Sequence, residues 1–244
     1  MTEWKTYRLG DICTLNYGKS LTATNRVAGD IPVYSSAGIT GSHNVALVQS
    51  KGIIVGRKGT VGTVYYSDKP FYCIDTAYYI LPDDEKYDFK WLYYRLKSLH
   101  LDKLNEDSAV PGLNRETAYA QEFPLPPLEE QRWIAGILGA IDDKIENNRR
   151  INTNLELQAQ ALYKQWFVDN RSDDWEEKKL SDFFNVVTGK KDANFSTKDG
   201  VYPFFTCSQD VLNAPDYSFE GAAILLAGNG DFNVKRYIGK FEAY

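Results

Sequence analysis

One sequence pattern occurs twice in this chain, and this repeat constrains the fold more than any other feature. The first occurrence starts at Trp4 and the second at Trp175, an offset of 171 residues. The same offset relates Leu9 and Leu180, Asp11 and Asp182, Gly18 and Gly189, Lys19 and Lys190, Gly29 and Gly200, Pro32 and Pro203, Ile53 and Ile224, Gly59 and Gly230, and Lys69 and Lys240. Ungapped agreement over about seventy residues indicates duplication. We therefore expect two related modules rather than one continuous core.

The first module, residues 1–125, has the pattern of a mixed α/β domain with a β-rich core. Runs of β-branched and aromatic residues between turn-forming residues predict strands at Ile31 to Ser35, Gly52 to Val55, Val61 to Tyr66 and Tyr72 to Leu81. Apolar residues at helical spacing predict a helix from Tyr87 to Leu96. Three prolines in residues 123–127 mark the end of the module.

Residues 126–170 predict one long helix. Pro127 and the acidic Glu129 and Glu130 suit a helix start, and no proline occurs in the rest of the segment. A set of mostly apolar residues follows spacings of four and three in strict alternation: Ile134, Leu138, Ile141, Ile145, Asn148, Asn152, Leu155, Ala159, Leu162 and Trp166. This alternation is typical of a coiled-coil seam.

The length of this helix bears on what covers its seam. At 1.5 Å per residue, the stretch from Ile134 to Trp166 spans about 48 Å, more than a compact domain of this size needs. We therefore expect the seam to pack against a partner outside its own domain. An amphipathic helix lying along its own domain is the alternative. Asn148 and Asn152 either select the register and partner of a coiled coil or mark a solvated gap between splayed helices.

The second module, residues 171–244, is expected to be incomplete. It ends at Tyr244, which the offset matches to Cys73, so the later strands and the helix around Trp91 have no counterparts. We expect this module to bury less apolar surface than the first, and either a neighbouring chain completes it or the chain is a truncated form. The expected class is α+β: a mixed α/β domain, a long helix and a partial second copy.

A glycine-rich turn is the strongest candidate binding feature. Residues 56–62, Gly-Arg-Lys-Gly-Thr-Val-Gly, follow an apolar strand and place Arg57 and Lys58 beside Gly59. Backbone amides freed by glycine and two cations suit a phosphate, and Arg57 alternatively suits the edge of a guanine. An ordinary exposed β-turn remains an equal alternative. The corresponding residues 227–231 keep glycines and lose both cations.

Three further residues complete the candidate DNA-contact set: Lys19, Asn114 and Arg115. The chain carries 28 basic and 33 acidic residues, a net charge of −5, so no global positive field favours a nucleic acid. Residues 1–125 carry equal numbers of acids and bases, which leaves room for a local cationic face. Tyrosines near these cations are more typical of a core than of a base-stacking surface, so we assign them no role.

No motif predicts catalysis, a cofactor or a metal. His43 and His100 are isolated, and Gly18-Lys19-Ser20 is no phosphate-binding loop because Cys13 stands where that loop needs a glycine. The acidic pairs of the chain suit solvated surface better than acid–base catalysis.

The cysteines and the hydropathy pattern indicate a compartment. Cys13, Cys73 and Cys207 are odd in number and far apart, which argues against a disulfide framework. The first residues lack an apolar leader, and no run reaches about 18 apolar residues. We therefore expect a cytoplasmic protein without membrane contact.

Three motifs together resemble the specificity subunits of type I restriction-modification systems. The third is the most specific of them. They are Trp-x-x-x-x-Leu-x-Asp at the start of each module, the turn at residues 56–62, and Leu-Pro-Pro-Leu-Glu-Glu-Gln at residues 125–131, which leads into the long helix.

The resemblance implies a non-catalytic DNA-recognition role. Members of that family carry two target recognition domains separated by long helices in an antiparallel coiled coil, and each domain reads one half of a split DNA target. A helix of about 48 Å then acts as a spacer, because one turn of B-DNA is about 34 Å long. The family's helices also dock modification subunits, which hold S-adenosylmethionine and methylate adenine, and restriction subunits join through them. No cofactor is therefore expected in this chain.

The single seam suggests how a chain with one long helix could build such a unit. We hypothesise that two copies pair through Ile134 to Trp166 and restore a two-fold arrangement. A coiled-coil adaptor with terminal β-rich domains that bind protein or glycan is the alternative function. An enzyme with an unrecognised site is a third hypothesis, which the missing acid–base constellation disfavours.

Overall fold

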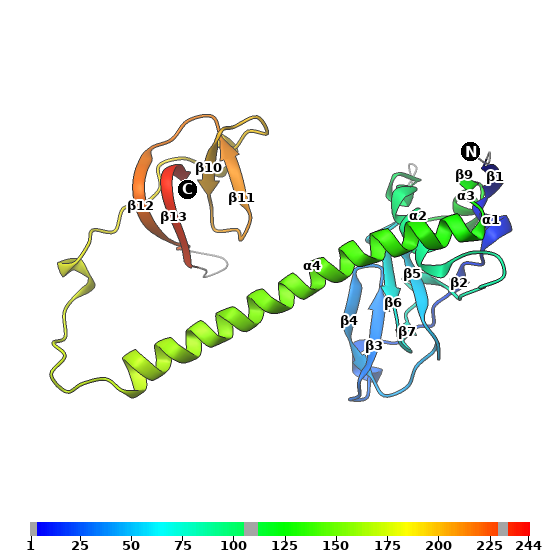
Figure 1. Ribbon diagram of the computed structural model, residues 1–244, viewed down its shortest axis with the longest axis horizontal. Coiled ribbons are helices and arrows are strands. Elements are labelled where there is room, and N and C mark those ends of the chain that lie inside the picture. Colours follow the sequence, from blue (N-terminus) through cyan, green and yellow to red (C-terminus); the bar gives the residue numbers. More distant parts are fainter. Residues whose placement is uncertain (1–3, 105–111, 229–233) are drawn as a thin grey trace. The chain divides into compact units, whose positions relative to one another are not determined.

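The computed structural model describes residues 4–104, 112–228 and 234–244 (Figure 1). The chain divides into two compact units, Met1–Lys164 and Gln165–Tyr244. In the described residues, no helix is long and apolar enough to cross a lipid bilayer.

Unit 1 is built on three small sheets. The largest has the order β2-β8-β5-β6, the second has the order β4-β3-β7, and β1 pairs antiparallel with β9. The strands are β1 (Lys5–Arg8), β2 (Asn16–Tyr17), β3 (Ile31–Ser35), β4 (Gly38–His43), β5 (Gly52–Gly56), β6 (Val64–Ser67), β7 (Tyr72–Cys73), β8 (Ala77–Ile80) and β9 (Glu122–Leu125). The strand predicted at Ile31 to Ser35 is confirmed, and those predicted at Gly52 to Val55 and Val61 to Tyr66 are confirmed with shifted ends. The prediction of one strand from Tyr72 to Leu81 is wrong: the chain turns at residues 74–76, and β7 and β8 lie in different sheets.

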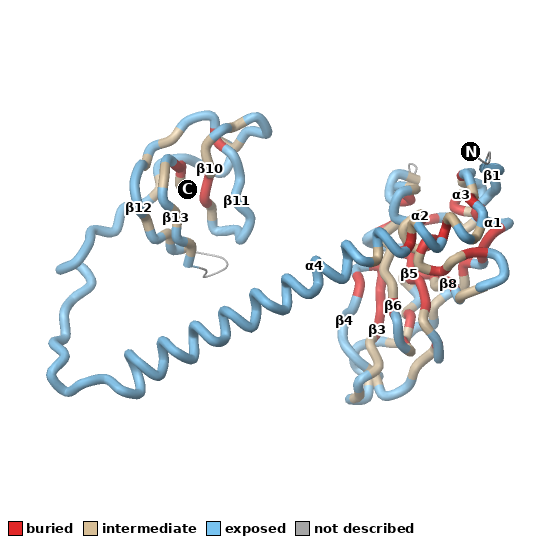
Figure 2. Tube along the Cα trace, viewed as in Figure 1, coloured by how far each residue is buried: buried red, intermediate tan, exposed pale blue. Residues whose placement is uncertain are grey.

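Strand β5 forms the centre of unit 1, because both of its faces are buried. Alternate side chains of a strand point to opposite faces, so Ile53 and Val55 enter one apolar cluster and Ile54 enters another. The first cluster includes Leu92 and Leu96, and all five side chains are fully buried. Figure 2 shows this strand in red within unit 1.

Short helices cover the larger sheet of unit 1. They are α1 (Leu9–Ile12), α2 (Phe89–Ser98) and α3 (Arg115–Tyr119), with the 3-10 turns η1 (Ala23–Asn25) and η2 (Leu101–Leu104). The helix predicted from Tyr87 to Leu96 is confirmed as α2. Asp88 caps it, since its carboxylate accepts a hydrogen bond of 2.8 Å from the Trp91 backbone amide.

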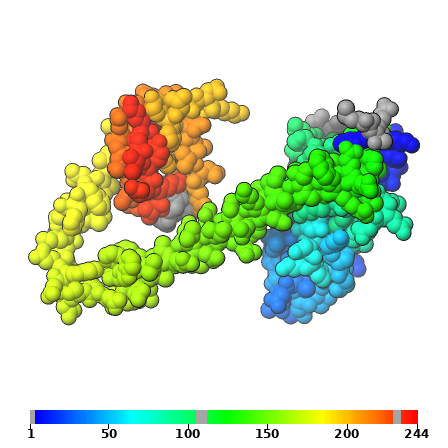
Figure 3. All heavy atoms as spheres, in the orientation of Figure 1, coloured from blue at the N-terminus to red at the C-terminus, as the bar shows by residue number. Residues whose placement is uncertain are grey.

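The predicted long helix is confirmed as α4 (Leu128–Tyr163), which continues into a π-helical turn at Lys164–Asp169. Its first turns pack on unit 1. Gln131 is buried and accepts from the Asp88 amide at 2.8 Å, and the Tyr94 hydroxyl donates to Asp142 at 2.7 Å. The helix therefore begins on its own domain, but it does not lie along that domain over its whole length. Figure 3 shows that it then extends away from the rest of unit 1.

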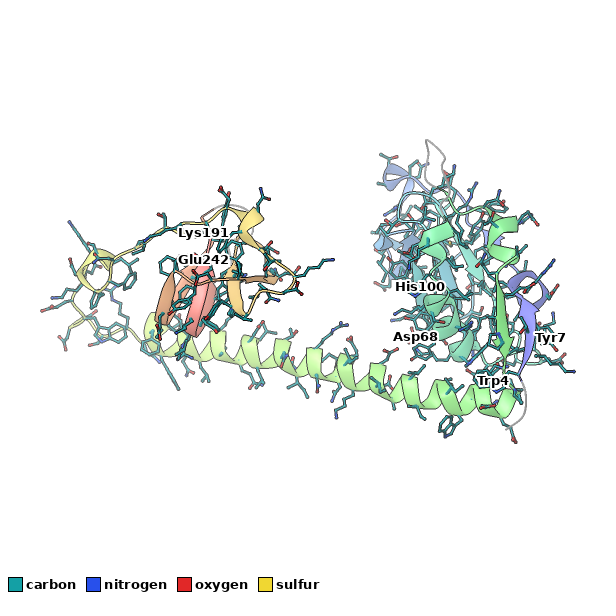
Figure 4. The ribbon with its side chains drawn as sticks, turned by 90° about the horizontal axis from the view of Figure 1, so that it is seen from above. Trp4, Tyr7, Asp68, His100, Lys191 and Glu242 are labelled. Atoms are coloured by element: carbon teal, nitrogen blue, oxygen red, sulfur yellow. The ribbon has the colours of Figure 1, made fainter. Side chains whose placement is uncertain are left out.

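Unit 2 contains one four-stranded sheet of order β11-β10-β13-β12. Its elements are η4 (Leu180–Asp182), η5 (Ala193–Phe195), β10 (Tyr202–Phe205), β11 (Val211–Ala214), β12 (Phe219–Leu226) and β13 (Val234–Ala243). Phe204, Phe205, Ala214 and Phe241 form its small buried core. Glu242 is also buried and accepts a hydrogen bond of 2.6 Å from the Ser218 hydroxyl (Figure 4).

Strand pairing shows that the repeat holds in space. In unit 1, Ile31 pairs with His43, and the matching pair in unit 2 is Tyr202 with Ala214, at the expected offset of 171. In the next hairpin the offset changes. The pairs Val48 with Phe71 and Val55 with Val64 correspond to Phe219 with Phe241 and Leu226 with Val234. The offset is thus 171 up to Leu226 and 170 from Val234 onward.

This shift corrects two expected matches. Lys240 is not the counterpart of Lys69, and Tyr244 corresponds to Ile74 rather than to Cys73. The backbone amides of Ile74 and Tyr244 donate to the carbonyl oxygens of Tyr34 and Phe205, at 2.9 and 3.0 Å, and these two acceptors are matched at offset 171. The physical reason is that the segment joining the two strands is one residue shorter in unit 2, and turns accept such changes more readily than paired strands.

Candidate nucleic-acid interface

The glycine-rich turn of unit 1 is fixed by its backbone. The amides of Arg57 and Lys58 both donate to the carbonyl oxygen of Thr76, at 2.9 and 3.0 Å. On the other side, the amide of Leu113 donates to the carbonyl oxygen of Arg57 at 2.8 Å. Hydrogen bonds therefore hold the backbone of Arg57 and Lys58 between the segment before β8 and the segment before α3.

Two glycines allow this turn to form. Gly59 and Gly62 have φ angles of +77° and +73°, a region that residues with a Cβ rarely adopt. Gly62 also abuts the backbone of Asp102, so that a Cβ would collide with it. The predicted role of Gly59 as part of the turn thus has a conformational cause, whatever the turn contacts.

The guanidinium group of Arg57 lies over aromatic rings. Its central carbon is 4.9 Å from the ring centroid of Tyr17 and 5.8 Å from that of Tyr78. One of its nitrogens donates to the carbonyl oxygen of Asp75 at 3.1 Å. This side chain is therefore held at a definite place and still has donors left for a ligand.

Arg115 lies over the same ring from another element. It is the first residue of α3, and its guanidinium carbon is 5.2 Å from the Tyr17 centroid and 5.9 Å from the Tyr119 centroid. Its Nε is 3.8 Å from the Glu116 carboxylate, and no acceptor within hydrogen-bond distance of this buried nitrogen occurs among the residues that the structure describes.

An open cleft of about 640 Å³ brings these groups together. Four of the predicted DNA-contact residues line it, namely Arg57, Lys58, Asn114 and Arg115. Among the described residues of the lining, Glu116 is acidic and three are cationic, so this part of the lining has an excess of positive charge although the chain is acidic overall. Such a cleft attracts anions locally.

Asn114 has a structural role that the sequence analysis did not assign. Its side-chain oxygen accepts from the Glu116 amide at 2.8 Å and from the Thr117 amide at 3.4 Å, which caps α3. Asparagine directly before a short helical run is the signal that predicts this role. Its substitution is therefore expected to disturb Arg115, the next residue.

Two predicted contact residues, Lys19 and Gly59, do not line the cleft. The Lys19 side chain is exposed, and its amide donates to the Cys73 carbonyl oxygen at 2.9 Å, on the segment that leads to Thr76. The matching residue in unit 2, Lys190, donates in the same way to the carbonyl oxygen of Ala243 at 3.2 Å. Any residue except proline could make this backbone contact, so it does not explain why both positions carry lysine.

The tyrosines that lie near basic residues in the sequence do not gather on one surface. Tyr66 packs against Phe89 and lies 4.3 Å from Lys90 Nζ, and Tyr72 meets His43 edge to face. Tyr17 and Tyr78 are the tyrosines that line the cleft, and sequence reasoning missed both. Burial raises the pKa of the Tyr78 phenol, so its hydroxyl stays protonated and donates to the Leu113 carbonyl oxygen at 3.1 Å.

The matching turn of unit 2 lies mostly outside the described residues. Ala227 and Gly228 are described, whereas Asn229, Gly230 and Asp231 are not. The sequence itself contains no lysine or arginine between Leu226 and Val234.

The predicted seam of α4 changes its surroundings along the helix. Ile134 packs against the core of unit 1, whereas Ile141 and Ile145 are 52% and 44% exposed. The later seam residues Asn148, Asn152, Leu155, Leu162 and Trp166 are exposed as well. Within unit 1, the apolar seam residues from Ile141 to Leu162 are thus left uncovered after the helix leaves the domain.

Burial keeps two of the three cysteines in the thiol form. Cys13 and Cys73 are buried, and burial raises the pKa of each thiol to about 12, so both stay protonated at neutral pH. Over the described ranges, no group of three or more His, Cys, Asp and Glu side chains is arranged to hold a metal ion.

Comparisons with known proteins give a consistent picture. A family model described as "Type I restriction modification DNA specificity domain" matches residues 1–157. The EcoDI specificity subunit of a type I restriction enzyme from Escherichia coli is 48% identical over 71 residues, which cover 29% of this chain and 16% of that protein. The MjaIX specificity subunit from Methanocaldococcus jannaschii is 31% identical over 158 residues, which cover 56% of this chain and 36% of that protein.

A solved structure resembles the fold. The crystal structure of a type I restriction-modification system S subunit from M. genitalium matches 98% of this chain and 70% of that chain, with a TM-score of 0.68 at 20% sequence identity. The match to the two curated relatives spans well under half of their lengths.

Proposed function

The chain belongs to the family of type I restriction modification DNA specificity domains, and from this membership we propose that it recognises one part of a DNA target without catalysing a reaction itself. In this proposal residues 1–125 form the first target recognition domain, residues 126–170 the spacer helix and residues 171–244 part of a second recognition domain. The observation that carries the proposal is the cleft at which Arg57, Lys58 and Arg115 converge.

The cleft suits duplex DNA better than a small anion. Arg57 and Lys58 come from the turn after β5, and Arg115 comes from the start of α3. The guanidinium groups of both arginines lie over the ring of Tyr17, and that of Arg57 also lies near the ring of Tyr78. Arginines held in fixed positions suit bidentate contact with a guanine edge, whereas Lys58 suits a phosphate. The remaining members of the proposed contact set are Lys19, Asn114 and Gly59.

Selection of sequences from a randomised duplex library tests the proposal. The full chain should enrich a defined motif, and its affinity should fall steeply as salt concentration rises. Arg57→Ala should weaken binding to the enriched duplex by about 1–3 kcal/mol, or about 5- to 150-fold, with less effect on scrambled duplexes. Lys86→Ala, which removes an exposed cation outside the cleft, is the matched control and should bind as the wild type does.

The outcome separates the competing functions. Equal losses on all duplexes would assign Arg57 to a phosphate rather than to a base. Binding that depends on neither salt nor sequence would favour an adaptor that binds protein or glycan and would overturn DNA recognition.

We also infer that a second long helix covers the exposed stripe of α4, and that a second copy of this chain can supply it. Exposure of Ile141 and Ile145 supports this proposal, because a stripe of this kind is normally covered. Light scattering after size exclusion should detect a dimer that Ile145→Asp disrupts. Asn147→Asp adds the same charge off the seam and should leave the dimer intact, and a wild-type monomer at micromolar concentration would contradict the pairing.

The wider assembly follows from the family rather than from the cleft. We propose that the chain docks modification subunits and, through them, restriction subunits, and that the modification subunits methylate the DNA to which this chain directs them. Its place of action is then the cytoplasm, which suits its free cysteines. Co-purification with modification subunits, followed by mapping of methylated sites, tests both points.

A further inference from the structure

Tyr17 occupies a special position in the cleft because two arginines from distant parts of the chain lie over its ring. The guanidinium carbons of Arg57 and Arg115 are 4.9 and 5.2 Å from its centroid, so they are at most about 10 Å from each other. Base pairs in duplex DNA rise by about 3.4 Å each, so this separation spans about three steps or fewer. Both arginines can therefore meet one short stretch of a duplex.

Tyr17 is not an ordinary core residue. It is the second residue of the short strand β2, and 47% of its surface is exposed. Its inner side contacts Tyr78, with ring centroids 5.1 Å apart, and Tyr78 is buried and hydrogen-bonded to the backbone of Leu113. The ring of Tyr17 thus packs against a buried, hydrogen-bonded tyrosine, while the two guanidinium groups also lie over it.

In unit 2, the positions that match Tyr17 and Arg57 carry neither an aromatic ring nor a cation. The counterpart of Tyr17 is Thr188, and no arginine or lysine occurs in the segment that corresponds to the turn of Arg57. The backbone around this position is nonetheless retained, because Gly18 and Gly189 abut the matching backbone segments. The aromatic ring and the arginine are therefore both present in unit 1 and both absent from the matching positions of unit 2, while the backbone contact of the glycine is common to both units.

We propose that Tyr17 is a specificity-determining residue that positions the guanidinium groups of Arg57 and Arg115 for contact with the same short segment of duplex DNA. This inference rests on the proposed function. Tyr17 acts through the two arginines and is a positioning residue. Its ring restricts the guanidinium planes, and a planar donor that is already oriented loses less freedom when it meets a base edge.

The test compares Tyr17→Leu, which removes the ring, with Tyr17→Phe, which keeps it. The readout is the ratio of affinities for the duplex enriched by the wild type and for a scrambled duplex, together with the salt dependence on the scrambled duplex. Tyr17→Leu should lower the ratio about 10-fold, because two cation–ring contacts are lost, and should leave the salt dependence unchanged, because every cation remains. Tyr17→Phe should stay within about twofold of the wild type.

Two further variants guard the conclusion. Tyr7→Leu changes an exposed tyrosine on β1 (labelled in Figure 4) that does not line the cleft, and it should leave the ratio unchanged. Arg115→Lys keeps the charge and loses the planar group, so it should lower the ratio as Tyr17→Leu does, and the double variant should add little. Arg115→Lys also tests the inference if Tyr17→Leu does not fold.

The outcomes are distinguishable. A wild-type chain that enriches no motif overturns the proposed function and this inference with it. A wild-type chain that enriches a motif, while Tyr17→Leu and Arg115→Lys discriminate as well as the wild type, overturns the inference alone. A weaker salt dependence in Tyr17→Leu also contradicts the inference. It would mean that the ring keeps the cations in contact with the DNA, whereas the inference says that it orients their guanidinium planes.

Discussion

Strands β5 and β12 carry nearly the same apolar sequence and lie in opposite surroundings. Ile53 and Val55 of β5 are completely buried, whereas their counterparts Ile224 and Leu226 in β12 are 69% and 62% exposed. Strand β5 pairs with β6 on one side and β8 on the other, and helices cover its sheet. In the described part of unit 2, β12 pairs with β13 alone. Figure 2 shows the contrast as red against pale blue.

The comparison teaches that a strand's pattern fixes its pairing but not its burial. The hairpin forms in both units with the same end pairs, because side-chain alternation and turn position set its register. In unit 1 the hairpin also packs against β8, α2 and η2, which lie within residues 77–104. The matched strands β5 and β12 should therefore differ strongly in how much their side chains contribute to the stability of their units.

The largest expected effect comes from truncating that strand. Ile53→Ala should lower the free energy of unfolding of unit 1 by about 2–5 kcal/mol, because it leaves a cavity in a packed core. The matched Ile224→Ala should change unit 2 by less than about 0.5 kcal/mol, because the side chain is mostly exposed. Denaturant unfolding followed by hydrogen exchange of the two strands resolves the units separately. Equal losses would show that β12 is covered in solution.

A glycine position should instead affect both units alike. A Cβ at Gly18 would collide with the Ile74 carbonyl group, and one at Gly189 would collide with the backbone of Tyr244. Gly18→Ala and Gly189→Ala should each destabilise their unit by about 1–3 kcal/mol. Gly136→Ala is the control, since no atom lies within 4 Å of the added carbon, and it should stabilise α4 by up to about 1 kcal/mol. Thermal melts of the three variants check this.

The contact between α2 and α4 gives unit 1 a dependence on alkaline pH. Burial, and then the hydrogen bond to Asp142, raise the pKa of Tyr94 above the ordinary value of about 10. The folded state thus holds the phenol proton more tightly than the unfolded state, so this contribution is complete at neutral pH and is lost as pH rises past about 10.

Tyr94→Phe isolates this contribution. At neutral pH it should cost about 0.5–1.5 kcal/mol, the usual net value of a hydrogen bond. Between neutral pH and about pH 10.5, the urea midpoint of the wild type should fall further than that of Tyr94→Phe. Parallel curves for the two proteins would mean that the hydroxyl does not hold the helix in solution.

The smallest effects should come from surface ion pairs, in either unit. Arg8 and Glu122 approach to 3.3 Å between β1 and β9, and Arg171 and Glu177 approach to 3.2 Å in unit 2. All four side chains are at least half exposed, so Glu122→Gln and Glu177→Gln should each change stability by less than about 0.5 kcal/mol. A larger loss for Glu122→Gln would give the β1–β9 pair an importance that its exposure does not suggest.

Sequence reasoning succeeded where the cause of a structure is local. Strand β3, helix α2 and helix α4 follow from side-chain patterns within a few turns or alternations, and all three were predictable. The pairing of β1 with β9 joins residues more than a hundred positions apart and includes Pro124, which sequence patterns alone had marked as a boundary. Proline is tolerated there because β9 is an edge strand.

The candidate site was predictable only in part, for the same reason. Arg57 and Lys58 were found because glycines mark their turn. Tyr17 was missed because its importance arises from a meeting of β2, the turn after β5 and the start of α3, which no local pattern encodes. The match of Lys69 with Lys240 misled because one residue is missing between the two strands of unit 2, and a chance lysine then restored the apparent register.

Because the two turns differ by one residue, each can replace the other only as a whole segment. Segments 56–63 and 227–233 join strand ends that pair in the same way, Val55 with Val64 and Leu226 with Val234. Replacing the whole of segment 227–233 by the whole of segment 56–63 keeps every later side chain on its present face of the strand. Exchanging equal numbers of residues would instead shift the pairing of the following strand by one residue and so invert its faces. New cations could thus be installed in unit 2 by transplanting residues 56–63 as one piece.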